Sequence, residues 1–392
     1  MNLGKTVFSQ LMEYIDHNDF HRIVRAHLHT RRRLPFSCWE QYLCMAFAQL
    51  TYRESLRDIE SCLRSLGPKL YHAGIRSSVS RSTLAHANEH RPWQIYRDLA
   101  LKLIAHARVL YAEDRFLAEI DAAVYALDAT VIDLCLKLFP WAKAQQHLAT
   151  TAAVKLHTLL DVQRNLPVFA RVTVANLNEV RMLDEISFEP GAFYVVDRGY
   201  TSFHRLKNID AAGAFFVIRA KRGLRFQRIV SHPVDKPNGV LVDQVIRFVV
   251  RRSLEEYPDQ LRRIKFFDAK TQRVFVFLTN DFLLEAAAIA ELYHSRWRIE
   301  LFFKWMKQHL RIKAFYGTSF NAVNTQIWIA LSVFVLVAIL KKKLHLDLSL
   351  YTILQILSLT LFEKEPIYQV LTDTKIANPH DCDPNQLTLF NL

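Results

Sequence analysis

The feature that most constrains this chain is a change of hydrophobic period near residue 120. Before it, apolar residues recur every three or four positions, as in residues 38–66, and predict helices through about residue 110. After it, residues 123–133, 154–162 and 166–175 are rich in β-branched and apolar side chains, which predicts three consecutive strands. Because the links between these strands are short, they favour an antiparallel meander.

Helices and strands alternate after the meander. We predict a short helix at 178–186, a buried strand at 193–199, a helix at 202–213 and a strand at 214–220. Further strands are expected at 242–250, 261–269 and 273–279, followed by one long helix from about residue 285 to 310. This order is that of an RNase H-like domain with a β-rich insertion before its last helix, so the prediction is an α/β (α+β) fold of that kind.

Four segments are expected along the chain. They are an all-helical N-terminal domain (1–75), a helical linker region resembling a helix-turn-helix (76–118), the RNase H-like catalytic domain (119–340, with its insertion at about 221–283), and a helical C-terminal segment with a polar tail (341–392). In the linker, a Ser-rich turn precedes a helix rich in Ser, Arg, His and Asn. That pattern is typical of a helix that reads a major groove, but a helical bundle with a polar outer helix explains it as well.

The charge balance indicates a polyanionic partner. The chain has 51 Lys and Arg against 38 Asp and Glu, a net charge of +13, which suits nucleic acid or a membrane surface. The apolar run at 327–340 has 14 residues, fewer than the roughly 18–20 needed to cross a bilayer, so we expect a core helix and no membrane partner. Five scattered cysteines and an N-terminus without an apolar signal core indicate a cytoplasmic protein.

A single carboxylate stands out in the otherwise basic segment YHSRWRIELFFKWMK, residues 293–307. On a helical wheel Tyr293, Arg296, Glu300 and Lys307 fall within an arc of roughly 60°, beside an apolar face. Taken alone, this edge is explained as well by a solvated surface with an Arg296–Glu300 pair.

Two distant aspartates change that interpretation. Asp128 lies in the middle of the predicted first strand and Asp197 at the end of the fourth. In an RNase H-like domain these two positions converge with the last helix, which carries Glu300. Three carboxylates suit two Mg²⁺ ions about 3.5–4 Å apart, as used in phosphodiester chemistry, and Mn²⁺ would substitute. We therefore predict that Asp128, Asp197 and Glu300 are the catalytic residues and the metal ligands.

These motifs resemble a known family. The spacing of Tyr293, Arg296, Glu300 and Lys307 matches the signature of DDE transposases of the insertion-sequence-4 group, relatives of the Tn-five transposase. The segments ALDATVI and VVDRGY are similar to the two aspartate motifs of that group. The resemblance covers about residues 120–340, and the first 75 residues also resemble a small helical domain often found at the front of these proteins.

The resemblance implies further roles. Tyr293 and Arg296 would hold the phosphate next to the cleaved bond, Lys307 would contact the DNA strand, and Trp297 would stack near a flipped base. The expected function is a transposase that binds the terminal inverted repeats of its own element as a homodimer. It would cleave double-stranded DNA and join the ends to target DNA with Mg²⁺. Residues 221–285 contain no tryptophan for a second wall of a base-flip pocket, which leaves the family's hairpin step open.

Further candidate residues and rival functions complete the prediction. Arg198, Lys221 and Arg222, with the basic runs at 31–33 and 219–228, would contact phosphates, although solvated surface also produces such runs. Lys155 and His157 share one side of the predicted second strand; that side would face the metal site, but a side that faces the core or solvent explains the pattern as well. One rival is a structure-selective nuclease of the same fold, which cuts without joining. Another is a non-catalytic DNA-binding protein derived from a transposase, against which the intact acidic triad argues.

Overall fold

The structure is a computed structural model that describes residues 4–28, 34–76, 78–117, 120–143, 152–234, 236–310, 312 and 314–372. The basic run at 31–33 and the tail 373–392 lie outside these residues. The chain forms two compact units, one up to Leu103 and again from Thr325, the other from Ile104 to Asn324. This division differs from the boundaries expected at residues 75, 118 and 340, because the C-terminal helices pack with the N-terminal ones.

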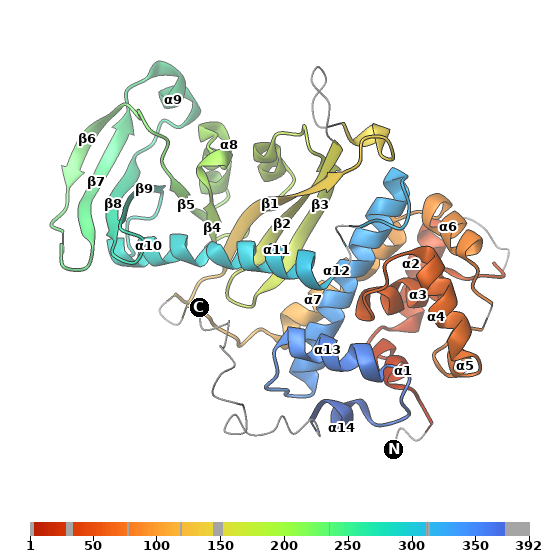
Figure 1. Ribbon diagram of the computed structural model, residues 1–392. Helices are drawn as coiled ribbons and strands as arrows, with labels where there is room; N and C mark the ends of the chain where they lie inside the picture. Colours follow the sequence, from red (N-terminus) through yellow and green to blue (C-terminus); the bar gives the residue numbers. More distant parts are fainter. Residues whose placement is uncertain are drawn as a thin grey trace. The chain divides into compact units, whose positions relative to one another are not determined.

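The first unit is helical, as predicted (Figure 1). Its central helix is α3, in which every residue except Trp39 is buried; a capping box between Ser37 and Glu40 closes its first turn. The helices that begin in this unit are α1 (Val7–Met12), α2 (His17–His27), α3 (Cys38–Leu50), α4 (Leu56–Leu66), α5 (Lys69–His72), α6 (Arg81–His90), α7 (Gln94–Leu110), α13 (Leu350–Thr360) and α14 (Ile367–Thr372).

The apolar run at 327–340 lies in α12 (Phe320–Lys343), which begins in the second unit and continues into the first. Among the described residues this is the one helix long and apolar enough to cross a membrane, but its most apolar window is entirely buried. Trp328 stacks on Trp93 with ring centroids 6.3 Å apart, and the hydroxyl groups of Tyr42 and Ser332 lie 3.2 Å apart. The expected core helix is therefore observed.

The second unit is built on one nine-stranded sheet with the order β3-β2-β1-β4-β5-β9-β8-β7-β6. The predicted meander is confirmed, because β1 pairs antiparallel with β2 and β2 with β3. Strands β4 and β5 continue the sheet parallel to β1. This is the RNase H-like arrangement. The first five of the nine strands are β1 (Val124–Leu134), β2 (Ala152–Asp161), β3 (Leu166–Val174), β4 (Phe193–Val196) and β5 (Phe215–Arg219).

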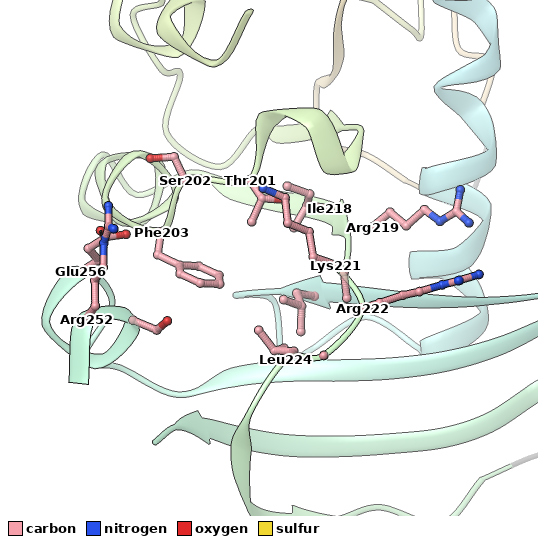
Figure 2. Close-up of a pocket in the computed structure, with 14 residues that line it drawn as sticks. Thr201, Ser202, Phe203, Ile218, Arg219, Lys221, Arg222, Leu224, Arg252 and Glu256 are labelled. Carbon is pink, nitrogen blue, oxygen red and sulfur yellow. Dashed lines mark hydrogen bonds and ion pairs between the residues drawn. The ribbon is translucent and has the colours of Figure 1, made fainter. Parts of the chain in front are cut away.

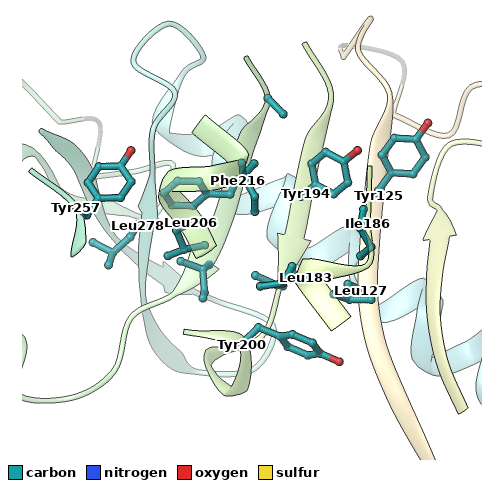
Figure 3. Packing of buried hydrophobic residues seen from close by; sticks show 14 of the residues in the cluster. Tyr125, Leu127, Leu183, Ile186, Tyr194, Tyr200, Leu206, Phe216, Tyr257 and Leu278 are labelled. Carbon is teal, nitrogen blue, oxygen red and sulfur yellow. The ribbon is translucent and has the colours of Figure 1, made fainter. Parts of the chain in front are cut away.

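One face of this sheet is covered by short helical segments. Buried side chains of β1, β4 and β5, among them Leu127, Tyr194 and Phe216, pack against Leu183 and Leu206 from these segments (Figure 3). Alternate residues of each strand point to this face, and every residue of β4 is buried because its other face is covered as well. The covering segments are η2 (Glu179–Asp184), η3 (Arg198–Tyr200), α8 (Phe203–Ala211) and α9 (Arg251–Glu256), and a further turn, η1 (Pro140–Ala142), follows β1.

The β-rich insertion is not a separate body. It consists of β6 (Phe226–Ser231), β7 (Val240–Phe248), β8 (Leu261–Asp268) and β9 (Arg273–Thr279), and β9 pairs antiparallel with β5. The insertion thus extends the catalytic sheet and covers the edge that β5 would otherwise expose. Between β7 and β8, Arg262 donates two hydrogen bonds to Asp243, at 2.9 and 2.8 Å, and both side chains are more than nine-tenths buried.

The prediction of one continuous helix from about residue 285 to 310 is wrong in that the helix is broken. It is two helices, α10 (Ala286–Ser295) and α11 (Trp297–His309), which lie end to end across the sheet (Figure 1). Around Arg296 the backbone bonds join residues three apart, from Arg296 N to Tyr293 O (3.2 Å) and from Ile299 N to Arg296 O (3.0 Å). This local tightening interrupts the α-helical pattern, and the apolar period on either side gives no sign of it.

Candidate active site

The sheet register places the two aspartates side by side. Leu127 and Val196 are the last paired residues of the parallel β1–β4 ladder, and Asp128 and Asp197 follow them directly. Beyond this point β1 remains paired with β2 but no longer with β4, so the edge of β1 on the β4 side is open from Asp128 onward. The Asp128 carboxylate accepts a hydrogen bond from the Ala129 amide at 2.8 Å, which orients it. Neighbouring residues of parallel strands point to the same face, so both carboxylates are directed to the face covered by α10 and α11.

The segment around the helix break connects all three acids. Tyr293 donates its hydroxyl hydrogen to Asp197 Oδ1 at 3.1 Å. Arg296 donates from Nη1 to Asp128 Oδ2 at 3.0 Å and from Nη2 to Glu300 Oε1 at 2.5 Å. The structure therefore brings together Asp128, Asp197, Glu300, Tyr293 and Arg296, which the sequence separates by up to 172 positions (300 − 128).

Lys307 lies at the margin of this network. Its Nζ donates to the Val131 carbonyl of β1 at 2.7 Å, and Lys307 lies about two turns beyond Glu300 on α11. The contact ties α11 to the part of β1 that extends past β4. Lys307 thus holds a cation near the acids.

Burial controls the ionisation of the network. It raises the pKa of Asp128 to about 6, although the Ala129 amide and the Arg296 guanidinium favour the charged form. Burial, followed by the nearby Asp197 charge, raises the pKa of Tyr293 to about 12, so its hydroxyl remains a hydrogen-bond donor near neutral pH. Arg296 is the cation that compensates Asp128 and Glu300, with 14% of its side chain exposed.

Three carboxylates are the hard oxygen donors that Mg²⁺ prefers, so the donor chemistry of the site fits this ion. Within the described ranges, however, no three His, Cys, Asp or Glu side chains form a group able to hold a metal ion. Arg296 stands between Asp128 and Glu300, and the Tyr293 hydroxyl is directed to Asp197.

An open groove of about 390 Å³ runs beside the acids. It is lined by Asp128, Ala129, Thr130, Glu300, Phe303, Lys304, Lys307 and Gln308. Lys304 was not among the predicted contacts, although it is four residues after Glu300 and therefore on the same side of the helix. Trp297, at the start of α11, is 59% exposed, so it is not a core residue.

A second cavity, of about 300 Å³, lies at the ends of β5 and η3 (Figure 2). Its rim holds Lys221 and Arg222, both predicted from the sequence, and Arg219, which was identified only as part of a basic run. Phe203 and Leu224 are directed into the space, and Arg252 pairs with Glu256 on its far side. Arg198 is exposed and directly follows Asp197, but it does not line this cavity.

Of the two alternatives for Lys155 and His157, the one in which they face the metal site is wrong. In the β1–β2 ladder, Asp128 is opposite Thr158, whereas Ala129 is opposite His157 and Val131 opposite Lys155. Since side chains alternate between the two faces, Lys155 and His157 point to the face away from the acids. Lys155 pairs with Glu179 at 2.8 Å, and burial lowers the pKa of His157 to about 4. The strand pattern alone did not reveal which set of alternate residues faced the site.

Comparisons with known proteins agree with this geometry. Residues 120–336 match the family model described as a transposase DDE domain, and residues 3–76 match a domain of unknown function. A putative transposase of Sinorhizobium fredii is 29% identical over 322 residues, which cover 79% of this chain and 86% of that protein. A probable transposase of an insertion sequence element from Geobacillus stearothermophilus is 26% identical, covering 68% of this chain and 70% of that protein.

A solved structure is also similar. It is a piggyBac transposase synaptic complex with hairpin DNA. The match covers 94% of this chain and 82% of the piggyBac chain, with a TM-score of 0.47 and 10% sequence identity.

Proposed function

Since this chain belongs to the DDE transposase family, we propose that it binds the terminal inverted repeats of its own mobile element and performs cut-and-paste transposition. The proposal includes metal-dependent cleavage of the DNA strands at the element ends and transfer of those ends to target DNA, by a homodimer. The observation that supports it is the contact network in which one helix break connects Asp128, Asp197 and Glu300.

Asp128, Asp197 and Glu300 would hold two Mg²⁺ ions, for which Mn²⁺ would substitute. Such ions, when bound, activate the attacking oxygen and stabilise the leaving oxygen of a phosphodiester. Tyr293 and Arg296 would bind non-bridging oxygens of the phosphate at the cleaved bond, because both donors already lie at the acids. Lys307, with Lys304, would neutralise the next phosphates along the groove.

The decisive experiment uses purified protein with Mg²⁺ and linear DNA that carries the two ends flanking its own gene. Release of the element from flanking DNA, followed by joined products with target DNA, supports transposition. Cleavage without joining, under conditions in which a preformed 3′-hydroxyl end is also supplied, would favour the nuclease alternative. Activity that survives EDTA would exclude the metal-dependent mechanism.

The basic cavity supports a path for DNA past the ends of β4 and β5, where Asp197 also lies. Its rim cations Arg219, Lys221 and Arg222 are held on the strand end next to Asp197, so they would contact phosphates of the same DNA end. Arg198, exposed after Asp197, would add a contact of the same kind. None of these contacts reads base edges, so they would contribute affinity and not sequence specificity.

Replacement of both Lys221 and Arg222 by alanine is expected to weaken DNA binding equally for cognate and unrelated duplexes. The slope of log K against log salt should become smaller by about 1.8, since each phosphate contact contributes about 0.9. Fluorescence anisotropy titrations at several salt concentrations measure this slope. Arg181→Ala, at an exposed position of η2 outside the cavity, is the control with one charge removed. An unchanged slope in the double variant would remove this cavity from the DNA path.

Trp297→Ala is expected to weaken DNA binding while leaving the stability of the protein nearly unchanged. Because its indole is 59% exposed, its loss should change the free energy of unfolding by less than about 0.5 kcal/mol. If the indole stacks on a base of the DNA end, binding of an end with an unpaired terminal base should weaken by about 1–3 kcal/mol. Trp297→Phe, which keeps an aromatic face, should recover most of this loss. A large drop in stability would instead indicate a packing role.

A further inference from the structure

Arg296 makes contacts that a phosphate-binding residue alone does not require. Its guanidinium bridges two carboxylates, at 3.0 Å to Asp128 and 2.5 Å to Glu300. Both Asp128 oxygens are engaged, one by Arg296 and the other by the Ala129 amide. A divalent cation held by Asp128 and Glu300 would have to bind the same carboxylate oxygens to which the positively charged guanidinium now donates. The guanidinium and the ion therefore compete for this pair of acids.

A second observation shows that the guanidinium is not fully satisfied where it lies. Its Nε is buried and has no hydrogen-bond partner among the described residues. A buried donor without an acceptor is unfavourable, so a position that offers more acceptors would be favoured over this one. A phosphodiester offers two non-bridging oxygens, which suit the fork of an arginine. The Tyr293 ring, 5.8 Å from the guanidinium carbon, would remain beside it in either position.

We propose that Arg296 holds the place of a metal ion in the DNA-free protein, and that an arriving DNA phosphate draws its guanidinium away and opens the acids to the metal. The inference rests on the proposed function, because it assumes that Asp128 and Glu300 are metal ligands. It adds that metal binding and DNA binding are coupled through one side chain. The DNA-free enzyme would then carry little metal and would have little capacity to cut unrelated strands.

The coupling can be measured without activity. Mn²⁺ is titrated into the full-length DNA-free protein, and the free ion is followed by its electron paramagnetic resonance signal. Arg296→Gln removes the charge and is expected to bind Mn²⁺ about 10-fold more tightly than the wild type, whereas Arg296→Lys, which keeps the charge, should stay near the wild type. Arg298→Gln is the matched control, since Arg298 is on the same helix but lies over the Phe116 ring, 3.9 Å from its centroid.

The reciprocal effect is measured on DNA. Ca²⁺, a hard ion for oxygen ligands, is expected to raise the affinity of the wild type for a fluorescent end duplex by about 5- to 150-fold relative to EDTA. In Arg296→Gln this ratio should fall close to one. Circular dichroism melting of each variant establishes that the comparison is made on folded protein.

Three outcomes decide the matter. Tighter Mn²⁺ binding together with a lost Ca²⁺ effect in Arg296→Gln supports the proposal. Equal or weaker Mn²⁺ binding in Arg296→Gln, with binding that still depends on Asp128 as tested by Asp128→Asn, overturns the proposal and leaves the metal site intact. If no Mn²⁺ binding depends on Asp128 in any variant, with or without DNA, the metal site of the proposed function fails, and this inference fails with it.

Discussion

Glu300→Gln and Asp128→Asn are each expected to lower the rate of DNA strand cleavage by about 10³-fold or more. Metal ions contribute several kcal/mol of charge stabilisation to such transition states, and about 1.4 kcal/mol corresponds to a factor of ten. Both substitutions keep the size and shape of the side chain but remove its charge and replace one acceptor oxygen by an NH2 donor. The loss should appear in single-turnover cleavage of end DNA under saturating protein, so that weaker binding does not contribute.

A matched control separates chemistry from folding in this experiment. Glu291→Gln makes the same change at an exposed position of α10, outside the contact network, and should cleave at the wild-type rate. Anisotropy titrations should show that Glu300→Gln still binds end DNA. Cleavage by Glu300→Gln within about tenfold of the wild type would contradict the role given to this acid.

The second large effect is expected on stability. Asp243→Ala should lower the free energy of unfolding of the second unit by about 3–5 kcal/mol, because it leaves the buried Arg262 charge without its partner. The pair joins β7 and β8, and β9 connects these strands to β5. Loss of the pair should therefore weaken the whole extended sheet. Chemical denaturation followed by tryptophan fluorescence and circular dichroism measures the change.

Two further variants test the physical reason. Glu255→Ala removes one partner of an exposed pair with Arg251 in the same insertion and should leave the unfolding midpoint unchanged. The double replacement Asp243→Leu with Arg262→Met should recover much of the stability lost in Asp243→Ala, since apolar groups of similar volume replace a buried ion pair at little cost. A double variant as unstable as Asp243→Ala would show that the loss comes from packing and not from an unpaired charge.

The pattern of elements was predictable because its signal is local. Strand β1 and helix α8 are each encoded by contiguous residues with a clear period, and their order indicates the RNase H-like fold. Asp128 was recognised by its place within β1 and Asp197 by its place directly after β4. The face to which Lys155 and His157 point was not predictable, since the pattern of one strand does not say which set of alternate residues lies on the catalytic face of the sheet.

The sequence by itself determined the element order, the β-rich insertion and the resemblance of three acids and a helix motif to a transposase family. Only the tertiary structure decided that the insertion extends the catalytic sheet through β9 and that Arg296 bridges Asp128 and Glu300 at a helix break. The physical reason is distance along the chain. Arg296 and Asp128 are 168 positions apart, so their contact depends on the pairing of β1 with β4 and on helices packed across both strands, which no local period encodes.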